Sequence, residues 1–92
     1  MIRSFSDKNV EKLFQDIPVA RFKNIERVAR RKLIFLDQAR TLNDLKSPPN
    51  NCLEALNANR AGQYSIRINK QWRLCFVWHE NDAYEVEIVD YH

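Results

Sequence analysis

The chain has 92 residues, of which 45% are apolar and 29% are charged, and its formal net charge is +3. This length fits one domain over residues 1–92, and one Gly and three Pro are not the composition of a disordered chain. No apolar run is long enough to cross a membrane, and the two Cys lack CxxC spacing, so we expect reduced thiols in a cytoplasmic protein.

Positive charge is concentrated in the N-terminal half. Residues 1–46 carry 11 Lys and Arg against 6 Asp and Glu, a net charge of +5, whereas residues 47–92 carry 4 against 6, a net charge of −2. A basic half predicts an anionic partner, although an ordinary solvated helix surface explains the same excess equally well.

The chain begins with "MIRSF", which is typical of a short strand, and continues with "SFSDKNVEKLFQDI", which predicts a helix ending before Pro18. Ser6 fits the N-cap position of this helix, and Phe5 and Val10 have the spacing of a hydrophobic staple. The expected buried face has helical periodicity and consists of Val10, Leu13, Phe14 and Ile17.

A second helix is predicted from Phe22 or Asn24 to about Ala39. Lys32 falls inside its apolar stripe, so that side chain must extend toward solvent or the helix must shift. "TLNDL" predicts one more helical turn, and "KSPPNN" predicts a stiff connector within the same domain. The stripe consists of Phe22, Ile25, Val28, Ala29, Leu33 and Leu36, and the basic residues on the other side are Lys23, Arg27, Arg30 and Arg31.

The remainder of the chain is predicted to form strands. "CLEAL" is a short one, "NRAG" is a turn, and "QYSIRI", "WRLCFVWH" and "AYEVEIVDY" follow with the three-residue loops "NKQ" and "END" between them. The expected fold is therefore α+β, with two N-terminal helices packed on one face of a small twisted antiparallel sheet.

Three-residue loops fix the register of these strands. The "NKQ" loop places Ile66 opposite Leu74 and Tyr64 opposite Phe76. The "END" loop places apolar side chains together on the same sheet face, with the pairs Trp78 and Tyr84, Phe76 and Val86, and Leu74 and Ile88. A slip by one residue would destroy this match, which supports the register.

The same register places Arg67 directly opposite Arg73 on the other face of the sheet. Like charges in a cross-strand pair destabilise a sheet, so an anion is expected beside them. Glu85 and Glu87 of the next strand are one source of negative charge, and a phosphate of a ligand is the other. Tyr91 lies on this face, diagonal to Arg73, whereas alternation directs Asp90 and His92 to the opposite face.

These residues suit RNA cleavage, in which the 2′-hydroxyl is already present as the nucleophile. The reaction needs a cation for the phosphate and two groups that transfer protons, and it needs no metal or cofactor. An arginine matches phosphate oxygens, and His92 titrates near neutral pH. Tyr91 is a poor base unless nearby arginines lower its pKa, and Asp90 is better suited to orienting a neighbour. No His or Cys spacing suggests a metal site.

The segments "RAGQYSIRINKQWRLCF" and "AYEVEIVDYH" resemble the HigB-type toxins of the RelE/ParE superfamily. "WR" before an apolar strand and the terminal "DYH" carry the resemblance, and "MIRSF" and the basic second helix extend it over essentially the whole chain. It implies a ribosome-dependent mRNA endonuclease and a HigA-type helix-turn-helix antitoxin, whose complex with the toxin would bind DNA to repress its own operon.

Carried over by position, the resemblance implies a catalytic set of Arg73, Asp90, Tyr91 and His92. Basic contacts to RNA are expected at Arg67 and Lys70, and the charge of Arg60 adds to them. On the second helix, Lys23, Arg27, Arg30 and Arg31 are expected to contact ribosomal RNA through phosphates or, alternatively, an acidic antitoxin surface. The chain departs from many relatives by carrying Glu54 and Asn57 where they carry a His and a Lys.

Two other interpretations stay open at this point. A ParE-type toxin has the same expected fold and inhibits a DNA topoisomerase without chemistry, although the terminal "DYH" argues against it. A plain interaction module would use Trp72, Trp78 and Tyr84 only as core residues, a role that the alternation predicts for them in any case.

Overall fold

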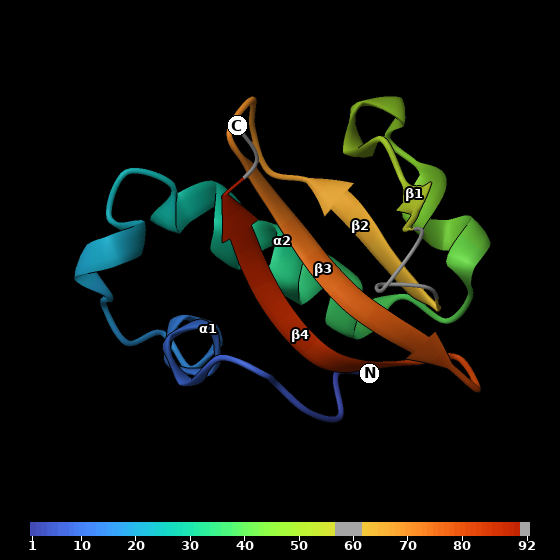
Figure 1. The fold of residues 1–92 in the computed structure, drawn as a ribbon, viewed down its shortest axis with the longest axis horizontal. Helices are drawn as coiled ribbons and strands as arrows, with labels where there is room; N and C mark the ends of the chain where they lie inside the picture. The colour runs from blue at the N-terminus through green and yellow to red at the C-terminus, as the bar shows by residue number, and fades with distance from the viewer. Residues whose placement is uncertain (57–61, 91–92) are drawn as a thin grey trace.

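The computed structural model, which describes residues 1–56 and 62–90, has two α-helices packed against a four-stranded antiparallel sheet (Figure 1). The helices are α1 (Lys8–Phe14) and α2 (Glu26–Gln38). The strands are β1 (Glu54–Ala55), β2 (Gln63–Arg67), β3 (Trp72–His79) and β4 (Asp82–Asp90), and they lie in this order across the sheet. The predicted α+β class is confirmed. Within the described ranges, no helix has the length and apolarity needed to span a membrane.

The N-terminal segment lies alongside β4 and pairs with it in parallel. The pairing consists of two isolated bridges, from Ile2 to Ala83 and from Phe5 to Val86, so the segment is bridged to the sheet but is not a regular strand. Its backbone N–H groups donate to the sheet, with Arg3 N to Ala83 O at 2.7 Å and Ser6 N to Val86 O at 3.1 Å.

Helix α1 begins one residue later than predicted. Asp7 is the N-cap, because its carboxylate accepts the Asn9 N–H at 2.8 Å, whereas the Ser6 hydroxyl donates to Glu87 at 2.9 Å. The prediction of Ile17 as a core residue is wrong, since its side chain is 43% exposed. The helix ends at Phe14, and Asp16 takes a left-handed conformation with φ of 67°, which turns the chain before Ile17 is reached.

Helix α2 follows a separate 3-10 turn, η1 (Ala20–Phe22), and buries the predicted stripe except for Val28, which is half-buried. Lys32 resolves its conflict with that stripe by donating from Nζ to the side-chain oxygen of Asn51. Burial lowers the pKa of Lys32, and the neighbouring charge of Arg31 lowers it further. The predicted extra turn is η2 (Leu42–Lys46), and the proline connector ends in η3 (Pro49–Asn51).

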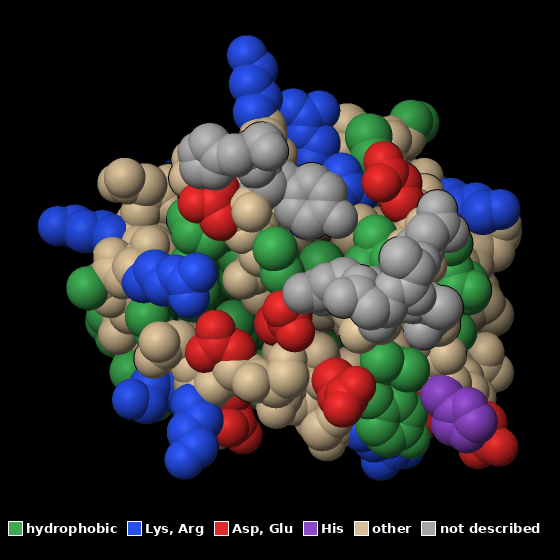
Figure 2. Space-filling view, in the orientation of Figure 1, with side chains coloured by type: hydrophobic (Ala, Val, Ile, Leu, Met, Phe, Trp, Pro, Cys, Tyr) green, Lys and Arg blue, Asp and Glu red, His purple; other side chains and the backbone are tan. Residues whose placement is uncertain are grey.

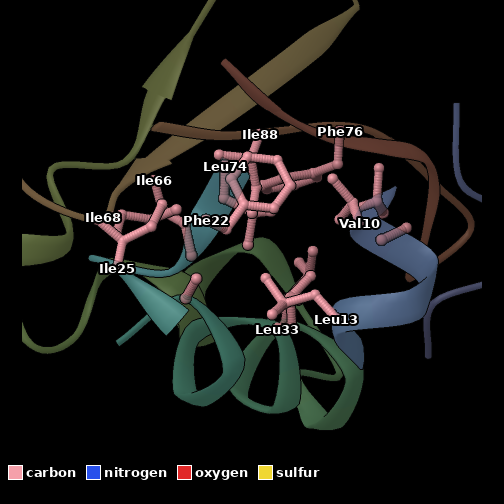
Figure 3. Packing of buried hydrophobic residues seen from close by; sticks show 14 of the residues in the cluster. Val10, Leu13, Phe22, Ile25, Leu33, Ile66, Ile68, Leu74, Phe76 and Ile88 are labelled. Atoms are coloured by element: carbon pink, nitrogen blue, oxygen red, sulfur yellow. The ribbon is translucent and has the colours of Figure 1, made fainter. Parts of the chain in front are cut away.

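The core lies between the sheet and the helices (Figure 3). Leu74, Phe76 and Ile88 project from the sheet toward Leu13 of α1 and Leu33 of α2, and all five are at most 3% exposed. Because the apolar face of the sheet packs against this core, its other face is available to polar side chains. We call that second face the open face.

The predicted register of β2 and β3 is confirmed, including Ile66 opposite Leu74 and Arg67 opposite Arg73. Between β3 and β4 the register is confirmed at Leu74 and Ile88 but is wrong near the turn, where Trp78 pairs with Ala83. The turn has two residues and not three, and a bulge at Glu85, with φ of 53°, restores the predicted register beyond it. Ala83 is therefore buried in place of Tyr84. The part of the register that was predicted wrongly does not include Arg67 or Arg73.

Candidate functional site

A basic depression lies where β2 and β3 meet the connector. Its volume is about 300 Å³, and three of its side chains are cationic and one is acidic. Figure 2 shows Lys and Arg side chains gathered over this end of the β2–β3 hairpin, close to the end of β4. The residues that line the depression are Cys52, Glu54, Arg67, Asn69, Lys70 and Arg73.

Arg73 lies at the base of the basic depression and is only 8% exposed. Its Nε donates to the Ser65 hydroxyl at 2.8 Å, and its Nη2 donates to the carbonyl of Cys52 at 2.6 Å and to that of Ser65 at 3.4 Å. These acceptors are neutral oxygens, and they fix the orientation of the guanidinium. A guanidinium held in a fixed orientation matches the oxygens of a phosphate.

The sequence suggested two sources of negative charge beside Arg67 and Arg73, namely the glutamates of β4 and a phosphate of a ligand. In the structure, Glu87 lies opposite Cys75 and accepts the hydroxyl of Ser6 at 2.9 Å, so it also fixes the N-terminal segment to β4. The Arg67 and Arg73 side chains both line the basic depression, which has room for a ligand beside them.

The connector supplies one of the acceptors of Arg73, a role that the sequence did not reveal. Asn51 is fully buried, and its amide donates to the carbonyls of Leu45 and Ser47 at 3.3 Å each. The next residue, Cys52, takes a left-handed conformation with φ of 49° and presents its carbonyl to Arg73. The Ser47–Pro48 peptide in this connector is cis. A backbone carbonyl has no sequence signature, whereas Ser65 was detectable as a small polar residue on the same face as Arg73.

The loop between β2 and β3 holds the basic residues in place. The side-chain oxygen of Asn69 accepts the N–H groups of Gln71 and Trp72, each at 2.8 Å, which closes the loop tightly. Lys70 is left exposed at its tip, and Arg67 is half-buried at the end of β2. The structure thus brings together Arg67, Lys70 and Arg73, of which the register predicted the proximity of Arg67 and Arg73.

Asp90 is the last residue of β4 that the structure describes. It pairs with Trp72, which packs on Phe22 at 5.7 Å between ring centroids, and its carboxylate accepts the Gln71 amide at 3.1 Å. Asp90 is absent from the lining of the basic depression and lines a separate one of about 410 Å³ with Glu87 and Arg21. Tyr91, His92, Arg60 and Asn57 lie outside the described residues, so their predicted contributions stay predictions.

The basic residues of α2 divide into two groups. Arg27 is exposed, as is Lys23 just before the helix. Arg30 does not belong to a free basic face: it forms ion pairs with Asp16 at 3.2 Å and Glu26 at 3.0 Å, and its Nε donates to the Leu13 carbonyl at 2.9 Å. The structure therefore favours a structural role for Arg30 over the predicted contact with RNA, because its side chain ties α2 to the end of α1.

Comparison with known proteins agrees with this architecture. A family described as "RelE-like toxin of type II toxin-antitoxin system HigB" matches residues 3–92. Toxin HigB-1 of Vibrio cholerae is 42% identical over 80 residues, which cover 85% of this chain and 84% of that protein. Endoribonuclease HigB of Proteus vulgaris is 30% identical over 97 residues, which cover all of both proteins.

Solved structures show the same fold. A chain from the YoeB–YefM toxin–antitoxin complex of Staphylococcus aureus has a TM-score of 0.61 at 24% identity, covering 100% of this chain and 98% of that chain. The match of the family over nearly the whole sequence and the two HigB relatives lead to one conclusion. This chain belongs to the HigB family of RelE-like toxins of type II toxin–antitoxin systems.

Proposed function

We propose that this toxin is an endoribonuclease that cleaves messenger RNA on the ribosome, without a metal, by attack of the 2′-hydroxyl on the adjacent phosphate. The observation that carries the proposal is Arg73, a cation that is 8% exposed and that neutral oxygens orient at the base of a basic depression. A relative aligned along its whole length is named an endoribonuclease, which supports the same activity.

Each side chain of the site has a chemical role in this proposal. Arg73 stabilises the negative charge that grows on the phosphate in the transition state, because its guanidinium is already oriented before the substrate arrives. Arg67 and Lys70 hold the phosphate or its neighbour from the walls of the basic depression. Tyr91 and His92 are the groups proposed for the proton transfers, with His92 the one whose usual pKa lies nearest neutrality, and Asp90 has the role of orienting a neighbour.

Glu54 adds a second candidate for proton transfer. It replaces the His found in many relatives, and it lines the basic depression together with Arg67 and Arg73. A carboxylate can accept the proton of the 2′-hydroxyl, but its charge also repels the phosphate. We therefore expect a lower cleavage rate than a His at this position would give.

The partners of the toxin follow from its family. We propose that a HigA-type helix-turn-helix antitoxin neutralises it, that the complex of the two reaches DNA through the antitoxin, and that Lys23 and Arg27 contact ribosomal RNA. The solved relatives that share the fold are complexes of a toxin with its antitoxin, which supports the first of these partners.

Mapping of message ends in cells tests the activity. Induction of the wild-type toxin should create new 5′ ends within translated messages, detected by primer extension, and Arg73→Ala should create none. Arg40→Ala, which removes an exposed arginine outside the basic depression, is the matched control and should leave the pattern unchanged. Growth arrest without new ends, together with inhibition of supercoiling by DNA gyrase, would replace this proposal with the ParE-type function.

A further inference from the structure

Two further depressions adjoin the basic depression. A second depression of about 340 Å³ shares Arg67 and Asn69 with it. A third, of about 280 Å³, shares Arg31, Lys32 and Asn50 with the second. The three depressions adjoin one another through these shared residues, from the β2–β3 hairpin to α2 and the proline connector. We call the part beyond Arg67 the basic groove, and its lining residues are Val28, Arg31, Lys32, Phe35, Pro48, Asn50, Arg67, Ile68 and Asn69.

The charge of the basic groove is entirely positive among the residues that line it. Arg31, Lys32 and Arg67 contribute cations, and neither of its two depressions has an Asp or Glu in its lining. Within the part of the chain that the structure describes, none of these three cations forms an ion pair, whereas Arg30 next to Arg31 forms two. The positive charge of the groove is thus available to an anion from outside the chain.

The wall of the basic groove holds one of these cations, Lys32, in a defined position. Lys32 is fixed by its hydrogen bond to the fully buried Asn51, and Arg31 directly precedes it on α2. The amides of Asn50 and Asn69 add neutral donors and acceptors to the walls. At the far end, Phe35 and Pro48 add apolar surface, on which a base or a ribose can pack.

We propose that the basic groove binds the RNA strand on one side of the cleaved phosphate, with a neighbouring phosphate between Arg31, Lys32 and Arg67. This inference rests on the proposed function for the identity of the ligand, and it adds the direction in which the strand leaves the basic depression. An acidic segment of an antitoxin would satisfy the charge alone. The wall shared with the depression of Arg73 favours RNA, because one strand can then contact both depressions.

Oligonucleotide length separates the two parts of the binding surface. A dinucleotide can occupy the basic depression, whereas a pentanucleotide can also reach the groove. Binding of 2′-O-methyl dinucleotides and pentanucleotides, which cannot undergo 2′-hydroxyl attack, should be measured at several salt concentrations with the purified toxin. Arg31→Gln tests the groove, Arg67→Gln tests the shared wall, and Arg40→Gln is the control with the same change of charge.

Arg31→Gln should weaken pentanucleotide binding about threefold to tenfold and leave dinucleotide binding unchanged, while the salt slope for the pentanucleotide falls by about 0.7. Arg67→Gln should weaken both, and Arg40→Gln neither. No loss in Arg31→Gln, an equal loss at both lengths, or no measurable pentanucleotide binding by the wild type at low salt would overturn the inference. Loss of antitoxin binding with pentanucleotide binding intact would assign the groove to the antitoxin instead.

These outcomes are distinct from those of the proposed function. Binding of uncleavable oligonucleotides does not depend on catalysis, so length-dependent binding would stand even if no message were cleaved. Conversely, cleavage that requires Arg73 would stand if Arg31→Gln bound both lengths as tightly as the wild type.

Discussion

The guanidinium of Arg73 donates to the hydroxyl of Ser65 at 2.8 Å, and both side chains are buried on the open face of the sheet. The hydrogen bond crosses from β3 to β2, where Ser65 lies two residues before Arg67, the residue that faces Arg73. In the proposed function Ser65 is therefore a positioning residue, since it acts on the substrate only through the arginine that it orients.

Ser65→Ala should lower the rate of message cleavage at least tenfold, because the guanidinium loses the acceptor that fixes Nε. The free energy of unfolding should fall by about 1 kcal/mol, as expected for one lost hydrogen bond. Cleavage of message on ribosomes and urea denaturation measure the two effects. Ser6→Ala, which also removes a serine hydroxyl that is hydrogen-bonded at the sheet, is the control and should leave the rate intact. Equal rates for Ser65→Ala and wild type would show that Ser65 does not position Arg73.

Arg30→Gln should destabilise the fold without a specific effect on RNA binding. Its Nε bond to the Leu13 carbonyl is partly buried, so we expect a loss of about 1–2 kcal/mol in the free energy of unfolding. The ion pairs to the exposed Asp16 and the half-buried Glu26 should add little. Arg27→Gln on the same helix is the control and should change the stability by less than about 0.5 kcal/mol. A stable Arg30→Gln variant with weakened ribosome binding would restore Arg30 to the RNA-binding residues.

The stability of the fold should fall in acid partly through Asp82. Hydrogen bonds from Arg3 and from the terminal amino group lower the pKa of this carboxyl, so the folded state favours its charged form. That contribution is present above the ordinary pKa of an aspartate and is lost as the pH falls through the lowered value. Urea midpoints at pH 6 and pH 2.5 should differ more for the wild type than for Asp82→Asn. An identical difference in the two proteins would rule out this contribution.

The turn between β3 and β4 offers a test of the observed register. Glu80 and Asn81 both have positive φ, at 48° and 65°, a conformation that Asn-Gly adopts more readily. Replacing the pair with Asn-Gly should raise the free energy of unfolding by about 0.5–1 kcal/mol, measured by thermal and urea denaturation. The three-residue loop that the sequence suggested has no such requirement, and a loss of stability would favour it.

The sequence allowed the pairing of the strands to be predicted better than the turns and the ends of the helices. Apolar alternation decided the pairing of β2 with β3, and with it the position of Arg67 opposite Arg73, because a slip would have buried polar side chains. The turn at Glu80 and Asn81 was missed because neither residue is the glycine that normally marks a two-residue turn. Helical periodicity predicted Ile17 in the core, but periodicity alone does not indicate the residue at which a helix ends.

The part of the candidate site that consists of side chains was predictable, whereas the part that consists of backbone groups was not. Arg67 and Arg73 meet as the register required, and Lys70 lines the same depression. The carbonyl of Cys52 was not predictable, since its position depends on the fully buried Asn51 and on a left-handed residue that is not glycine. The role of Arg30 was also hidden, because its partner Asp16 lies in an unexpected turn of the chain.

The cleavage rate of a message bound to purified ribosomes, measured with wild type, Arg73→Ala and Arg40→Ala, tests the central claim most directly. We predict products with a 2′,3′-cyclic phosphate and a 5′-hydroxyl for wild type and Arg40→Ala. Arg73→Ala should cleave at least about a hundredfold more slowly, as expected for loss of a preorganised group that stabilises the transition state, while circular dichroism shows the same fold. Cleavage by folded Arg73→Ala at the wild-type rate would contradict the account.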